Sequence, residues 1–190
     1  MDLAALVAAT ARSTRPDGDG HLVALERRLD AAPAEVWAAL TEPERVGAWF
    51  EPVVVEGGRY RLEGSGTAGA VLVCEPPALL RLTWEYDGGS SPLEVALRPD
   101  GAGTLLRLAH GADDDEHWQE YGPGAAGVGW DGSLLALERH LVGGASEEPD
   151  GTAFVRASAA AWERAHRAAG ASIVVAKTAA ARVAAFYTAE

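Results

Sequence analysis

The stretch Gly129–Leu141 constrains the fold of this chain more than any other segment. Its large apolar side chains recur at helical spacing and share one narrow stripe: Trp130, Leu134, Leu137 and Leu141. The polar side chains lie off that stripe: Asp131, Glu138, Arg139 and His140. This pattern predicts a helix with one apolar face, which Gly143 and Gly144 can end by taking a positive φ.

The chain before this helix contains about seven short segments with β-strand patterning, which could cover its apolar face. We expect strands at residues 21–30, 53–56, 59–63, 67–74, 79–86, 93–98 and 104–110. The later strands are joined by short connections rich in glycine, proline and aspartate, as antiparallel neighbours require. Alternation along these strands predicts one apolar inner face: Leu80, Leu82, Trp84, Tyr86, Leu93, Val95, Leu97, Leu106, Leu108 and His110.

Two short helices should follow the first strand. Pro33 suits the first turn of a helix, and the sequence from Thr41 to Glu44 is typical of a capping box. Pro43 then falls early in the second helix, and Trp49 and Phe50 close the pair.

The two ends of the chain differ from this central part. Residues 1–20 are predicted to form a short helix or arm, whose apolar run is too short to span a membrane. From Ala145 the sequence becomes alanine-rich, and Gly170 separates two helical stripes. These stripes are Phe154, Ala161, Ala165 and Ala168, then Ile173, Ala176, Ala180, Val183 and Tyr187. We expect residues 145–190 to pack on the core at residues 21–144 or on a partner subunit.

Composition restricts the classes of partner. A chain of 190 residues can bury a sizeable core in one domain, and its formal net charge is -12. That charge opposes binding to nucleic acid and to anionic membranes. Cys74 is the single cysteine, so no internal disulfide can form, and we expect a cytoplasmic protein with Cys74 as a buried thiol.

Three segments carry a resemblance to a known family: residues 29–44 with Trp49 and Phe50, residues 75–77 leading to residues 82–84, and the helix from Gly129 to Leu141. Their order resembles the SRPBCC superfamily, also called START-like or birch-pollen-allergen-like, and within it the group named after the activator of the heat-shock-protein-90 ATPase. The resemblance implies an α+β helix-grip fold, in which a curved antiparallel sheet wraps a long C-terminal helix.

The glycines before and within that helix depart from the family pattern. They are Gly122, Gly124, Gly127, Gly129 and Gly132, and each glycine inside a helix costs roughly 1 kcal/mol relative to alanine. We therefore expect the helix to start late.

The resemblance also implies a cavity between the sheet and the last helix. Ala126 and Gly127 share the side of Trp130, which leaves the inner face of the helix nearly bare. An apolar ligand would then be bounded by Trp49, Tyr60, Trp84, Tyr86, Leu106, His110, Ala126, Gly127, Trp130 and Leu134. The polar groups that could orient it are His110, Tyr60, Tyr86, Arg27 and His117. The alternative is a packed core in which the aromatic side chains fill this volume.

The sequence carries no catalytic or metal-binding motif that we recognise. It lacks a nucleophile elbow, a zinc-protease motif, a phosphate loop and paired cysteines, and its histidines have no ligand spacing. The acidic residues 113–117 lack the central glycine of a calcium loop and are read as a solvated loop. We therefore expect no cofactor and no bound metal.

Three functions remain open from the sequence. The first is a non-enzymatic START-like domain that binds a small apolar or amphipathic ligand. The second, implied by the family name, is a protein-interaction module for a chaperone. The third is an enzyme resembling the cyclase and aromatase members of the superfamily, with His110 and Tyr86 as acid and base. The alanine-rich extension also suggests a homodimer.

Overall fold

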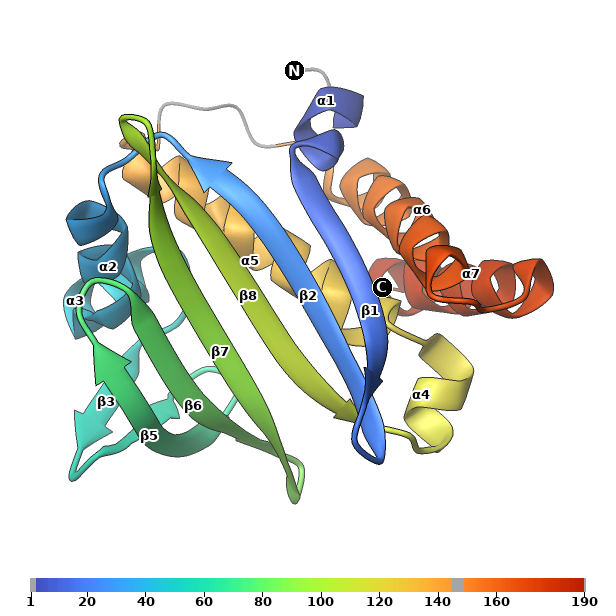
Figure 1. The fold of residues 1–190 in the computed structure, drawn as a ribbon, viewed down its shortest axis with the longest axis horizontal. Coiled ribbons are helices and arrows are strands. Elements are labelled where there is room, and N and C mark those ends of the chain that lie inside the picture. Colours follow the sequence, from blue (N-terminus) through green and yellow to red (C-terminus); the bar gives the residue numbers. More distant parts are fainter. Residues whose placement is uncertain (1–2, 145–148, 190) are drawn as a thin grey trace. The chain divides into compact units, whose positions relative to one another are not determined.

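A computed structural model describes residues 3–144 and 149–189 (Figure 1). The fold is α+β, with an open, curved antiparallel sheet of eight strands in the order β1-β2-β8-β7-β6-β5-β4-β3. The strands are β1 (Thr10–Asp17), β2 (Gly20–Leu29), β3 (Val53–Glu56), β4 (Arg59–Leu62), β5 (Ala68–Glu75), β6 (Leu79–Tyr86), β7 (Gly89–Asp100) and β8 (Gly103–Asp113). The helices are α1 (Leu3–Ala8), α2 (Pro33–Thr41), α3 (Pro43–Trp49), α4 (Glu116–Tyr121), α5 (Gly124–Leu141), α6 (Gly151–Ala168) and α7 (Ile173–Thr188).

Two compact units make up the described chain. The first contains the described parts of residues 1–26, 111–132 and 147–190, and the second those of residues 27–110 and 133–146. The N-terminal arm and the C-terminal extension therefore belong to the same unit, together with the first half of α5. Ala145, where the extension was predicted to begin, lies outside the described residues.

The predicted α+β class and most of the predicted elements are confirmed, but the strand count is one too low. Residues 10–17 were predicted as part of the arm and its turn, and they form β1. The less exposed positions of β1 carry Thr10, Arg12 and Thr14, which are all polar. An alternation of apolar side chains therefore cannot reveal this strand.

A buried carboxylate holds the first unit together. Asp131 on α5 is only 4% exposed and accepts two hydrogen bonds of 2.9 Å from the guanidinium of Arg12 on β1. On α6, the hydroxyl of Ser158 and the indole nitrogen of Trp162 donate to the same carboxylate, at 2.6 and 3.0 Å. Arg12 also donates to the carbonyl oxygens of Val7 and Thr10. The carboxylate thus connects both ends of the chain to α5.

The long helix begins earlier than the sequence predicted, at Gly124. The reason is tertiary packing within the first unit. A Cβ on Gly127 would lie 2.2 Å from the indole of Trp162, and a Cβ on Gly124 would lie 3.2 Å from Val183. These glycines let α6 and α7 approach α5 closely, so packing offsets their weak helix propensity. The predicted end is confirmed, because Gly143 and Gly144 have φ values of 73° and 70°.

Two local predictions are wrong and a third is right only in part. The acidic residues 113–117 are exposed as predicted, but Glu116 and His117 belong to a helix, α4, in which the Asp115 side chain accepts a hydrogen bond of 2.8 Å from the backbone N–H of Trp118. The capping box is absent, since the Thr41 hydroxyl donates back to the carbonyl oxygen of Trp37. Cys74 is exposed, because it lies beside the turn that follows β5 rather than under the sheet.

The second unit has the apolar core that strand alternation predicted. Residues directly opposite one another form rows across the sheet, such as Leu80–Val95–Leu108. The fully buried members of this inner face are Leu93, Val95, Leu97, Leu106 and Leu108. The second half of α5 belongs to this unit, where Leu134 and Leu137 are buried and the guanidinium of Arg27 on β2 donates to Glu138 at 2.5 Å.

Replacing Asp131 should strongly destabilise the protein. In Asp131→Asn the guanidinium of Arg12 stays buried without a matching charge, so the free energy of unfolding should fall by about 3–5 kcal/mol. Denaturant unfolding measures this change. The control is Asp17→Asn, which breaks an exposed pair with Arg15 and should cost less than about 1 kcal/mol. Equal losses in the two variants would show that the buried network contributes no special stability.

Two glycine substitutions in α5 should have effects of opposite sign. Gly127→Ala should destabilise by about 1–3 kcal/mol, because its new methyl group overlaps the indole of Trp162. Gly132→Ala should stabilise by about 0.5–1 kcal/mol, because nothing lies within 4 Å of its new methyl group and alanine is the better helix former. Thermal unfolding of the two variants checks this, and a stabilised Gly127→Ala would contradict the packing described here.

Candidate ligand-binding site

Three adjacent strands of the second unit bring Trp84, Ser91 and His110 together. Trp84 on β6 is directly opposite Ser91 on β7, and His110 on β8 is directly opposite Leu93, two residues further along β7. Residues opposite one another, or two apart on one strand, point to the same face of a sheet. The Trp84 and His110 rings accordingly meet edge to face, with centroids 5.9 Å apart.

His110 is an uncharged polar group in apolar surroundings. Its side chain is 8% exposed, and its Nε2 atom lies at hydrogen-bond distance, 2.8 Å, from the Ser91 hydroxyl oxygen. Burial lowers the pKa of His110 to about 4, so the imidazole is neutral at pH 7. The pair can therefore offer a hydroxyl and a neutral imidazole, but no charge, to a neighbouring molecule.

Tyr60 extends this aromatic group toward β4. Its ring lies 6.5 Å from that of Trp84, and it passes over Gly69, where a Cβ would come within 2.8 Å of the ring. The Tyr60 hydroxyl donates to the carbonyl oxygen of Thr83 at 2.8 Å. Burial, reinforced by the charge of Glu85, raises the pKa of Tyr60 to about 12. Tyr60 therefore contributes an aromatic face, while its hydroxyl is engaged with the sheet.

The apolar inner face of the sheet in the second unit is not buried to the same degree on every strand. On β7 and β8 its apolar side chains are buried, whereas Leu80, Leu82 and Trp84 on β6 are only half-buried. The middle of this sheet therefore presents apolar surface that the described protein atoms do not fully cover.

The remaining predicted residues of the second unit are distributed along this face and its edges. Leu106 and Leu134 are buried, and half-buried Trp49 donates its indole N–H to the carbonyl oxygen of Ala39 at 2.9 Å. Tyr86 is 60% exposed at the turn between β6 and β7. Its partner Gly89 is four residues from Leu93, the partner of His110, so about 13 Å of strand separates them. Tyr86 and His110 are thus not neighbours.

The other three predicted cavity residues, Ala126, Gly127 and Trp130, belong to the first unit. The face of Gly127 was predicted to be bare, and this is wrong, because the indole of Trp162 occupies it. Ala126 and Trp130 are half-buried. Of the other polar candidates, His117 is exposed on α4 and Arg27 is paired with Glu138.

Sequence reasoning missed Ser91. It lies in the segment Gly88-Gly89-Ser90-Ser91-Pro92, whose composition indicates a turn, so the strand was predicted to begin at Leu93. The alternation of Leu93, Val95 and Leu97, extended backwards by two residues, would have placed Ser91 on the inner face.

No group of three or more metal-ligating side chains is found among residues 3–144 and 149–189. In the same part of the chain, no helix is long and apolar enough to cross a membrane.

The fold and the aromatic group can now be compared with known proteins. Residues 30–142 match the family described as activator of Hsp90 ATPase homolog 1-like protein. The chain belongs to this family. The match confirms the resemblance on which the fold was predicted. No match is found among curated protein sequences.

Solved structures support the family assignment. The crystal structure of CalU16 from Micromonospora echinospora is 35% identical, with a TM-score of 0.60, over 70% of this chain and 86% of CalU16. The solution structure of CalU16 is 30% identical, with a TM-score of 0.67, over 85% of this chain and 97% of CalU16. That coverage is longer than residues 30–142, so the likeness to CalU16 extends beyond the family match.

Two further structures are informative. DynU16, a protein of the dynemicin biosynthetic locus, is 25% identical, with a TM-score of 0.57, over 68% of this chain and 49% of DynU16. The Aha1 dimer from Colwellia psychrerythraea is 16% identical, with a TM-score of 0.54, over 66% of this chain and 98% of that protein. The last comparison shows a shared fold only.

The burial of His110 should make stability depend on pH. The folded protein holds this imidazole neutral down to about pH 4, whereas the unfolded chain protonates it near pH 6.5. The unfolded state thus binds more protons between these values, and the stabilisation present above pH 6.5 is lost as the pH falls to 4. This loss is about 3 kcal/mol for a shift of this size.

Denaturant unfolding of wild type and His110→Gln at pH 7 and pH 4 measures the effect. The variant should lack this part of the acid destabilisation, whereas His117→Gln, a change on the exposed face of α4, should retain it. An unchanged pH profile in His110→Gln would show that His110 is not held neutral in the folded protein.

Proposed function

We propose that this protein is a non-enzymatic START-like domain that binds a small apolar or amphipathic molecule against the inner face of its sheet. The observation that carries this proposal is the incomplete covering of Leu80, Leu82 and Trp84 beside the buried apolar side chains of β7 and β8. Sites for small molecules combine such apolar surface with a few placed polar groups.

The polar groups on this face favour an uncharged contact. His110 is neutral, and Ser91 lies within hydrogen-bond distance of it. Arg27, a cation buried in the same unit, is matched by Glu138. A hydroxyl or carbonyl group of the ligand would find a partner at the Ser91–His110 pair, whereas a carboxylate would lose its hydration there without gaining an opposite charge.

The family membership supports this proposal only in general terms. The START-like fold is compatible with ligand binding, and DynU16 comes from a biosynthetic locus, where small molecules are handled.

An enzymatic function is the main alternative, and the Ser91–His110 pair is the observation that favours it. A serine within hydrogen-bond reach of a histidine is the arrangement used for nucleophilic catalysis. A pKa near 4, however, makes His110 a weak base at neutral pH, and Tyr86 is not placed to act with it. Binding without turnover therefore fits these residues better.

Protein partners form a second alternative. The family description and the Aha1 dimer suggest a chaperone or a second copy of the chain. Exposed apolar side chains on α7 support a homodimer through the extension: Ile173, Val174, Val175, Phe186 and Tyr187. A stable interface usually buries about 800 Å² on each partner. Light scattering tests the dimer, and a chaperone ATPase assay tests the other partner.

A ligand screen tests the binding proposal. In thermal unfolding with lipids and aromatic metabolites, a true ligand at 100 times its dissociation constant should stabilise the protein by about 2.7 kcal/mol. Leu82→Trp, which fills the half-buried face, should weaken binding at least about tenfold, a change of 1.4 kcal/mol. Leu72→Trp is the matched control, because Leu72 is 59% exposed on β5. A ligand that binds all three proteins equally would place its site elsewhere.

A further inference from the structure

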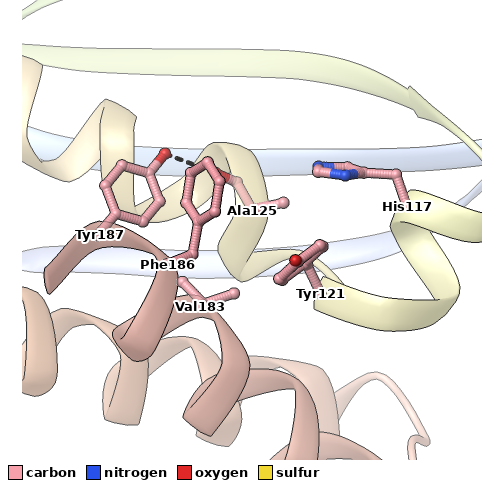
Figure 2. Close-up of a pocket in the computed structure, with 6 residues that line it drawn as sticks. All are labelled: His117, Tyr121, Ala125, Val183, Phe186 and Tyr187. Atoms are coloured by element: carbon pink, nitrogen blue, oxygen red, sulfur yellow. Dashed lines mark hydrogen bonds between the residues drawn. The ribbon is translucent and has the colours of Figure 1, made fainter. Parts of the chain in front are cut away.

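The first unit contains a small hollow lined by four aromatic side chains (Figure 2). His117 and Tyr121 come from α4, and Phe186 and Tyr187 from the last turns of α7. Ala125 on α5 and Val183 on α7 complete the lining. The aromatic rings therefore come from two helices that are far apart in sequence and enclose one space.

The rings are inclined to one another instead of being stacked. From His117 to Tyr121 the centroids are 4.9 Å apart at 46°, from Tyr121 to Phe186 5.9 Å at 58°, and from Phe186 to Tyr187 5.3 Å at 82°. The Tyr187 hydroxyl donates to the carbonyl oxygen of Ala125, another lining residue, at 2.8 Å. Figure 2 marks this hydrogen bond with a dashed line. Tyr187 is therefore fixed with its ring, and not its hydroxyl, beside Phe186.

The size of the hollow limits what can enter it. Its volume is about 30 Å³, room for two or three water-sized groups. Phe186 is 63% exposed, so the hollow is bordered by a large aromatic side chain in contact with solvent. One methyl group of a larger molecule could be inserted here, with the rest of that molecule in solvent.

The charges around the hollow favour a cation. Carboxylates precede and follow its His117 wall along the chain: Asp113, Asp114, Asp115, Glu116 and Glu120. Neither arginine nor lysine is among its lining residues. The nearest arginine or lysine in sequence is Arg182, whose guanidinium is directed at the carbonyl oxygen of Glu120 at 3.5 Å. The whole chain carries a formal net charge of -12, which also attracts small cations.

We propose that this pocket binds the methylated ammonium group of a small organic cation. The faces of aromatic rings attract such a group through their quadrupole, and one of its methyl groups has the size that the hollow accepts. A neutral molecule of the same shape receives only the apolar part of this interaction. An attached phosphate would be repelled by the neighbouring carboxylates, so the favoured ligand is a free cation, not a phosphocholine headgroup.

Three probes of similar shape test the proposal on the full chain. Choline, its neutral isostere 3,3-dimethylbutan-1-ol and phosphocholine are titrated while the backbone amide signals are followed by NMR. Choline should give saturable shifts at Tyr121, Val183 and Phe186. The neutral isostere should bind roughly two- to fivefold more weakly, as expected for a cation–π contact at an exposed site. Phosphocholine should also bind more weakly than choline.

Two substitutions separate the roles of ring and charge. Phe186→Leu keeps an apolar wall but removes a ring, so it should bring the affinities for choline and its isostere close together. Arg182→Gln should strengthen choline binding without affecting the isostere. Val174→Ala, a change on an exposed residue of the same helix, should alter neither, and unchanged amide spectra elsewhere show that each variant is folded.

Equal affinity of wild type for choline and the isostere would overturn the proposal, since the pocket would then be merely apolar. It would also be overturned if no saturable shift occurred at these residues up to about 100 mM choline, far above the millimolar constants of weak sites. Stronger binding of phosphocholine than of choline would contradict the assignment to a free cation.

Discussion

The first unit depends on one buried ionic interaction, that of Asp131 with Arg12. A carboxylate removed from water is costly unless its oxygen atoms are hydrogen-bonded and its charge is matched. Asp131 meets both conditions by drawing on β1 for a guanidinium and on α6 for a hydroxyl and an indole N–H. The same requirement fixes where these elements lie, because each must present one side chain to a single carboxylate. The apolar contact between Trp162 and Gly127 then follows from the position of the indole.

Much of the second unit could be predicted from the sequence because its strands are marked by patterns between residues close together in the chain. The strands β6 to β8 alternate clearly and are separated by turn residues, so strand alternation identified their inner face, including His110. The first unit was harder to predict because the residues that contact one another in it are far apart in the sequence. The less exposed side chains of β1 are polar, so this strand has no apolar alternation. Asp131 was predicted to lie on the polar face of its helix, whereas it accepts a hydrogen bond from Trp162. Gly127 of α5 is required because the indole of Trp162 packs against it. None of these partners can be assigned before the tertiary structure is known.

The candidate site shows the same division. Trp84 and His110 were predicted from alternation along the strands, and Tyr60 as a boundary of the cavity that the family resemblance implies. Ser91 was missed because glycine and proline surround it. Tyr86 follows the same alternation as Trp84, yet at the end of β6 it is largely exposed. Alternation predicts the face of a sheet, but the depth of a residue on that face depends on what covers it. That covering is also what distinguishes the half-buried β6 from the buried β7 and β8.

The two units differ in how many separate stretches of chain form them, and this difference affects folding during synthesis. The second unit is nearly continuous, since most of it lies within residues 27–110, whereas the first combines three separated stretches of chain. Arg12 leaves the ribosome some 150 residues before Ser158 and Trp162. Until then the carboxylate of Asp131 lacks two of its three donors, and the long loop between its partners must still close. We therefore expect the β-rich unit to fold first on the nascent chain, and the other unit to be completed only after Trp162 has left the ribosome.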